Sequence, residues 1–182
     1  MKKYADFLLS NLGIKDKKEA KANPYNAYTY EKGMHLGEWL DPEEFQEKIS
    51  AGKQPKHPEE ATAYLYLDMT TMAEIAELLD KDPITYRETA EGARKAYNHL
   101  FVKTCTLDTD RQAKLVQPLA LVLLDGESKK TAQRRLAKAA QDCHYHVGTG
   151  FLSTVFLLPV LTEAGEVETA YKMLGNTENP AG

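Results

Sequence analysis

The chain has 182 residues, of which 42% are hydrophobic and 27% charged, and its formal net charge is -4 at pH 7. This composition is ordinary for a folded protein, and a mild negative charge spread along the chain disfavours a nucleic-acid partner. The longest apolar runs, 119–124 and 155–161, are far shorter than the roughly 20 residues that cross a bilayer. We therefore expect neither nucleic-acid nor membrane partners.

The amino-terminal residues and the two cysteines indicate the cellular compartment. Asp6 interrupts the apolar segment that a secretory signal peptide needs, so export is not expected. Cys105 and Cys143 lie on separate predicted elements without metal-ligand spacing, which is typical of reduced thiols. A disulfide between them is the less favoured alternative. We expect a cytoplasmic protein.

Apolar residues recur at helical spacing along most of the chain, which predicts an all-α protein. A short amphipathic helix is expected over 1–12, ended by Gly13 in a conformation of positive φ. The segment 14–40 is predicted to be a loop rich in tyrosine, and long aromatic loops in compact domains are often functional. Asp41 predicts the cap of a short helix that ends near Ser50.

Three antiparallel helical hairpins are predicted after this segment, each an apolar helix followed by an amphipathic partner. Their helices are expected over 58–79 and 83–101, 110–124 and 127–143, and 151–162 and 167–174. Pro118 and Pro159 should bend or break the first helix of the second and third hairpins. Apolar inner helices that alternate with amphipathic outer ones are typical of an α/α toroid. We expect residues 1–182 to form a single helical domain, about half of an (α/α)6 barrel.

Three stretches of the sequence point to a family. They are HYHVGTGFLSTVFLLPVLTEAG from His144 to Gly165, YEKGMHLGEWLD from Tyr30 to Asp41, and RQAKLVQPLAL from Arg111 to Leu121. Together they resemble the helical catalytic domain of bacterial α-L-rhamnosidases, over nearly the whole chain. The resemblance implies hydrolysis of terminal α-L-rhamnose from glycosides, without a cofactor. It also implies that this chain is part of that domain, with the catalytic carboxylates before Met1 and after Gly182.

Gly37-Glu38-Trp39 is the strongest candidate for sugar contacts, because the family resembled usually has Gly-Asp-Trp here, facing the sugar pocket. A tryptophan offers a flat apolar face to the C–H face of a sugar, and an adjacent carboxylate accepts hydrogen bonds from hydroxyls. Glu38 is one methylene longer than the usual Asp, which puts the geometry of its contact in doubt. His35 is a further candidate donor to a hydroxyl. The competing interpretation makes Trp39 a core anchor of its loop and Glu38 a solvated side chain.

Tyr25, Tyr28 and Tyr30 are candidates for the rim of the same site, or for ordinary packing. The loop Gly148-Thr149-Gly150 precedes a predicted helix and is expected to line the mouth of the barrel, with anion binding at the helix start as the alternative. We take Thr149 and Gly150 as substrate-binding candidates.

A metal site has to be weighed at His144 and His146, which flank one residue and follow Cys143. No fourth ligand is spaced to complete it. We expect no metal.

The resemblance implies an inverting mechanism, which needs a protonated carboxyl and a carboxylate roughly 6.5 to 9.5 Å apart. The family carries these groups in Asp-Glu-Arg and Trp-Glu-Arg type motifs, and the sequence contains neither. Asp41, Glu43 and Glu44 lie near Trp39, but helix capping and the helix dipole explain them. Catalytic residues within this chain are therefore unknown, and we expect the chain alone to be inactive.

The rival hypothesis is a non-enzymatic module whose stacked hairpins bind a protein partner, as in solenoids. Unequal hairpin spacing argues against it, and no regular 34-residue repeat is visible. Half of a barrel would leave an open apolar edge, so we also expect self-association through that edge.

Overall fold

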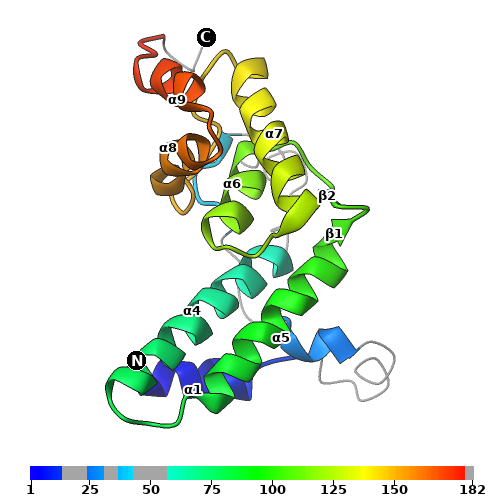
Figure 1. Cartoon of the computed structure of the whole chain (residues 1–182), viewed down its shortest axis with the longest axis vertical. Helices are drawn as coiled ribbons and strands as arrows, with labels where there is room; N and C mark the ends of the chain where they lie inside the picture. Colours follow the sequence, from blue (N-terminus) through cyan, green and yellow to red (C-terminus); the bar gives the residue numbers. More distant parts are fainter. Residues whose placement is uncertain (14–23, 31–36, 43–56, 179–182) are drawn as a thin grey trace. The chain divides into compact units, whose positions relative to one another are not determined.

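The computed structural model describes residues 1–13, 24–30, 37–42 and 57–178, which are mostly helical (Figure 1). Their elements are α1 (Lys2–Ser10), η1 (Pro24–Tyr28), α4 (Pro58–Leu78), α5 (Ile84–Phe101), β1 (Val102–Lys103), β2 (Thr106–Leu107), α6 (Gln112–Ala120), α7 (Gly126–Asp142), α8 (Thr154–Glu163) and α9 (Val167–Leu174). The predicted all-α class is confirmed. None of the described helices has the length and apolar character that crossing a membrane requires.

The chain divides into two compact units. The first comprises Met1–His35 and Lys56–Phe101, and the second comprises Leu36–Pro55 and Val102–Gly182. The single domain expected over residues 1–182 stays a prediction. The short helix expected from Asp41 to Ser50 lies mostly outside the described residues.

The first unit is built on the hairpin of α4 and α5. Pro58 opens α4, where a missing N–H costs no hydrogen bond, and Glu59 and Glu60 lie in the first turn near the positive end of the helix dipole. Asp82 Oδ1 accepts a hydrogen bond from Ile84 N at 2.9 Å and so caps the start of α5. Both predicted helix starts are confirmed.

The core of the first unit gathers where α1 packs on this hairpin. Its buried members are Ala5, Leu8, Leu65, Met69, Met72, Ala90 and Ala93. Gly13 follows α1 with a φ of +76°, as predicted. Leu79 stands at the predicted end of the α4 stripe, but it is exposed and lies one residue after the end of the helix.

The tyrosine-rich segment is held by side-chain packing within the first unit. The rings of Tyr25 and His99 stack with their centroids 4.2 Å apart. The Tyr28 ring lies so close to Gly92 that a Cβ on that glycine would be 2.3 Å from the ring. Tyr30 packs against the core cluster. These contacts give all three tyrosines a structural role.

The second unit contains α6 to α9, in which α6 contacts α7 and α8, and α8 contacts α9. The buried stripe of α7 is the predicted one, namely Ala132, Leu136, Ala139 and Ala140. However, α6 ends at Ala120 rather than Leu124, because Val122 turns to a φ of +56° and Leu123 N donates to Pro118 O at 3.0 Å. Leu123 and Leu124 are buried outside the helix, and an apolar run alone does not distinguish that arrangement from a helix.

Two further expectations for α6 and α8 need correction. Pro118 and Pro159 lie inside these helices, which continue to Ala120 and Glu163, so neither proline breaks its helix, and the predicted bend stays a prediction. Each removes one backbone donor while keeping φ in the helical range. In addition, α8 begins at Thr154 rather than Phe151, because the residues before it form a turn.

A small antiparallel hairpin formed by β1 and β2 has no counterpart among the elements predicted from the sequence. Its turn residues Thr104 and Cys105 have φ values of 51° and 59°. Tight hairpin turns with two positive φ angles usually take Asn-Gly or Asp-Gly, so a Thr-Cys pair carries no such signal. Cys105 and Cys143 are both free thiols.

Arg135 of α7 ties this hairpin to the helices. Its guanidinium donates hydrogen bonds to Thr106 Oγ1, to the carbonyl oxygens of Leu107 and Thr109, and to Asp110 Oδ1. The hydrogen bond from Arg135 also lowers the pKa of the Asp110 carboxyl. One planar side chain therefore holds four acceptors in β2 and in the segment that follows it.

We predict that Arg135→Ala lowers the free energy of unfolding by about 2 kcal/mol, since hydrogen bonds to charged groups contribute about 1.5–3 kcal/mol. The matched control is Arg134→Ala on the same helix, whose side chain is 66% exposed and pairs only with surface groups at Glu127 and Thr131. That change should cost under about 1 kcal/mol. Urea unfolding followed by circular dichroism measures both, and equal losses would contradict the assignment.

The same pair predicts a pH dependence. Because the pKa of Asp110 is lowered in the folded state, its contribution to stability is present above its ordinary pKa and is lost as pH falls below about 4. The stability difference between the wild type and Arg135→Ala should therefore shrink in acid. A difference that stays constant from pH 7 to pH 3 would show that the Asp110 contact contributes nothing.

Candidate functional site

Glu38 is the residue that fixes the candidate site in the second unit. Its Oε1 accepts a hydrogen bond from Ser153 N at 2.6 Å, and its Oε2 accepts one from Ser153 Oγ at 2.9 Å. Ser153 is the N-cap of α8, where backbone N–H groups lack partners within the helix and the dipole favours a negative charge. Glu38 therefore caps α8 from a loop 115 positions earlier in the chain.

The backbone around Trp39 lies directly against the loop before α8. Phe151 N donates to Trp39 O at 2.7 Å. A Cβ on Gly150 would lie 2.3 Å from Trp39 O and 2.7 Å from Asp41 N, so only glycine allows this approach. Gly37 and Leu40 turn the loop with φ values of 64° and 66°. The two candidate segments, around Trp39 and around Gly150, therefore lie in direct contact.

The side chain of Trp39 is 53% exposed, and its neighbours Leu40 and Phe151 are also exposed. The interpretation of Trp39 as a core anchor of its loop is therefore wrong. Glu38 is the opposite case, because it is 1% exposed and directed at Ser153. Its direct contact with sugar hydroxyls stays a prediction.

Thr149 and Gly150 complete this part of the site. Thr149 is buried, and its hydroxyl shares a hydrogen bond of 2.8 Å with the hydroxyl of Thr154. Thr154 Oγ1 also donates to Gly150 O at 2.6 Å, which ties the loop to the first residue of α8. Gly150 thus contributes close backbone packing rather than a functional group.

The first turn of α6 anchors both loops, and sequence reasoning gave these residues no role. Arg111 forms an ion pair with Asp41, whose side chain is fully buried. Gln112 donates from Nε2 to His146 O at 3.0 Å and accepts at Oε1 from Gly148 N at 3.0 Å. The signals in the sequence were the stretch from Arg111 to Leu121 that supports the family resemblance, and two polar residues at the start of an otherwise apolar helix.

Asp41 has a charged partner that the sequence did not indicate, because Arg111 pairs with its carboxylate. Its predicted role as a helix cap stays a prediction, since the residues that follow Pro42 lie outside the described ranges. A buried carboxylate requires such pairing because desolvation penalises an unpaired charge. His35, Glu43 and Glu44 lie outside the described residues.

Groups of side chains that could ligate a metal occur at two places in the described residues. In the first unit, His57, Glu59 and Glu60 place ligand atoms within 4.8 Å of one another, and His57 Nδ1 lies 3.5 Å from Glu59 Oε1. A His–Glu contact at a helix start accounts for this grouping without an ion. In the second unit, His146 Nδ1 lies 3.3 Å from Asn176 Nδ2, so this ring nitrogen already has a polar neighbour.

Comparison with known proteins gives the family. Residues 12–181 match the model of the bacterial α-L-rhamnosidase six-hairpin glycosidase domain. The chain belongs to this family. An α-L-rhamnosidase of Formosa agariphila is 30% identical over 150 residues, which are 80% of this chain and 16% of that protein.

Solved structures agree with this membership. The α-L-rhamnosidase of Streptomyces avermitilis complexed with L-rhamnose is 28% identical, with a TM-score of 0.68 over 81% of this chain and 14% of that one. The α-L-rhamnosidase of Dictyoglumus thermophilum is 25% identical, with a TM-score of 0.71 over 98% of this chain and 19% of that one. The chain thus has the helical-hairpin fold of this family's α/α barrel and spans less than a fifth of these relatives.

We predict that Gly150→Ala lowers the free energy of unfolding by about 1–3 kcal/mol, because the added methyl group meets backbone atoms that cannot move aside. It should also displace the loop of Trp39 and shift the fluorescence of this single tryptophan. Gly175→Ala is the matched control, since its nearest contact is Tyr171 O at 3.3 Å. That change should stay within about 0.5 kcal/mol with an unchanged emission spectrum. An unchanged spectrum in Gly150→Ala would contradict the contact.

Proposed function

We propose that this chain is part of a glycoside hydrolase that removes terminal α-L-rhamnose from glycosides, and that it supplies one loop of the sugar pocket. The observation that carries the proposal is the loop of residues 37–41, which is locked onto the start of α8 while its tryptophan stays exposed. Membership in the rhamnosidase family supports the choice of sugar.

Trp39 is the residue proposed to touch the sugar, because an exposed indole on a rigid loop can stack against the C–H face of a pyranose ring. Glu38 is proposed to act as a positioning residue, since both of its oxygens accept hydrogen bonds from Ser153. This assignment replaces direct hydroxyl binding as the first role of Glu38. Thr149 and Gly150 shape the loop that faces Trp39.

The reaction is proposed to be inverting, which requires a general acid and a general base. The two motifs in which the family carries these groups are absent from this sequence. Asp41 is committed to Arg111 and Glu38 to Ser153, so neither buried carboxylate is placed to supply them. Loss of an acid and a base each costs about 10² to 10⁴-fold in rate. The chain by itself is therefore proposed to bind sugar without hydrolysing it.

The surroundings proposed for the protein follow from its chemistry. Two free thiols fit a cytoplasmic location, and no metal, cofactor, nucleic acid or membrane is required by the proposed reaction.

Several large apolar side chains of the second unit are exposed, including Val155, Tyr171 and Leu174. We expect self-association through such surfaces, which light scattering of the purified chain tests. A monomer at all concentrations would count against it.

We predict that L-rhamnose changes the fluorescence of Trp39 in a saturable manner. This tryptophan is the only one in the sequence, so the signal reports on this site alone. Mirror-image D-rhamnose serves as the control ligand. Trp39→Ala should abolish L-rhamnose binding measured by calorimetry, whereas Tyr171→Ala, which removes another exposed aromatic ring, should not. Equal responses to both enantiomers would contradict a specific sugar site.

We predict that the chain does not release the aryl group of an aryl α-L-rhamnoside above the background rate. The reason is the missing acid and base, which together supply about 10⁴ to 10⁸-fold if their effects multiply. The assay requires a preparation whose mass is verified. Robust turnover that is lost in Glu38→Gln or Asp41→Asn would show that catalytic carboxylates lie within this chain.

A further inference from the structure

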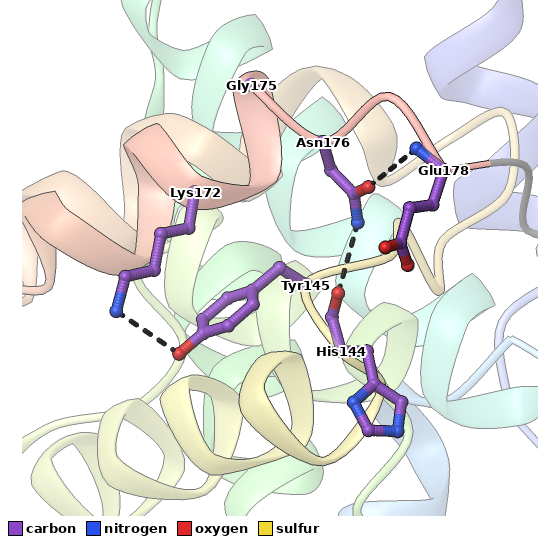
Figure 2. Close-up of a pocket in the computed structure, with 6 residues that line it drawn as sticks. All are labelled: His144, Tyr145, Lys172, Gly175, Asn176 and Glu178. Carbon is purple, nitrogen blue, oxygen red and sulfur yellow. Dashed lines mark hydrogen bonds between the residues drawn. The ribbon is translucent and has the colours of Figure 1, made fainter.

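A cleft of about 500 Å³ lies on the second unit, between the end of α7 and the end of α9 (Figure 2). Its lining residues are His144, Tyr145, Lys172, Gly175, Asn176 and Glu178. The cleft is open to solvent, since His144, Lys172, Gly175 and Glu178 are exposed. The loop of Trp39 contributes nothing to this lining, so the cleft is separate from the candidate site.

Strained backbone places two of the lining residues. His144 and Tyr145 follow each other with φ values of 51° and 63°, a conformation that residues other than glycine rarely adopt. They form a left-handed end of α7 of a kind that many helices have, in which His144 N donates to Gln141 O at 3.0 Å. Tyr145 N donates to Ala140 O at 2.8 Å, which fixes the turn at the end of α7.

Asn176 organises the cleft from the other side. Its Nδ2 donates to His144 O at 3.0 Å, and its Oδ1 accepts from Glu178 N at 2.9 Å. In Figure 2 this amide lies between the Lys172 and Tyr145 side chains on one side and the Glu178 carboxylate on the other. The two loops that form the cleft are therefore joined by one side chain.

The charged side chains in the lining limit the net charge of a ligand that can bind in the cleft. Lys172 supplies one ammonium group, which lies 3.4 Å from Tyr145 Oη and 5.1 Å from the centre of its ring. Glu178 supplies one carboxylate. A simple cation would be repelled by the ammonium and a simple anion by the carboxylate. A neutral ligand that carries several hydroxyl groups can instead use both charges, the phenol and the imidazole as hydrogen-bond partners.

The cleft and the candidate site both involve the segment that joins α7 to α8. The segment 143–153 joins the end of α7 to the start of α8, and 175–178 follow the end of α9. In antiparallel hairpins both segments lie at the end where α6 and α8 begin. Gln112 holds His146 and Gly148, which stand in sequence between the cleft and the contacts of Trp39.

We propose that this cleft binds a neutral saccharide unit of a glycoside, in addition to the terminal rhamnose assigned to Trp39. The inference rests on the proposed function, because that function makes the ligand a glycoside. The bound unit is held by hydroxyl contacts to Lys172, Glu178 and Tyr145, so a glycoside with a second sugar gains affinity over a single rhamnose.

The test is a titration of the ¹⁵N-labelled chain followed by NMR, with the disaccharide α-L-rhamnosyl-(1→6)-D-glucose, methyl α-L-rhamnoside and inorganic phosphate as probes. The disaccharide should move the amide signals of Tyr145, Lys172, Asn176 and Glu178. Lys172→Met and Glu178→Gln should each weaken this response about tenfold, as expected for loss of a charged hydrogen-bond partner. Lys129→Met on the exposed start of α7 is the control and should change nothing.

Two results would overturn the inference. One is the absence of any disaccharide response at the four amides, and the other is a response to phosphate at lower concentration than to the disaccharide. The indole N–H signal of Trp39 reports separately on the proposed function. Cleft signals that respond while the indole signal ignores methyl α-L-rhamnoside would refute the rhamnose site but not the saccharide cleft. The reverse pattern would refute the cleft alone.

Discussion

The arrangement of the second unit depends on one buried carboxylate at a helix start. Glu38 is 1% exposed, and burial of a carboxylate costs several kcal/mol unless hydrogen bonds compensate. Ser153 supplies two such bonds, and the α8 dipole adds a favourable field. Because the carboxylate must stay at this place, the loop that carries it has little freedom. The neighbouring Trp39 can therefore stay exposed, because the contacts of Glu38 hold the loop in place.

The first turn of α6 extends this constraint to a larger region. Arg111 neutralises Asp41 on one loop, and Gln112 satisfies two backbone groups of the other. Three segments that are distant in sequence are thus joined by polar contacts that would each be costly to leave unmade. Such networks respond to substitution as units, so the effects of changes at Glu38, Arg111 and Gln112 should not be additive. The loop that carries the proposed sugar contact is therefore held in place by buried and partly buried side chains.

Much of the fold was predictable because it rests on local patterns. Pro58 and Asp82 mark helix starts by their own chemistry, and the stripe around Leu136 follows helical periodicity. The errors arose where tertiary contacts override local preference. The end of α6 at Ala120 and the hairpin turn at Thr104 and Cys105 need left-handed residues that no sequence signal announces. At the site, the sequence singled out Trp39, but the partner of Glu38 was hidden because Ser153 lies far along the chain.

Gly150 shows that a position can exclude every other residue type although it contributes no functional group. Its Cα faces the backbone of Trp39 and Asp41, whose identities do not affect the contact, because backbone atoms are the same in every residue. Substitutions elsewhere cannot make room for a side chain there unless the whole loop moves. Selection would therefore hold this glycine as firmly as a catalytic group, and a family-wide survey of invariant positions would rank it among active-site residues although it only sets a distance.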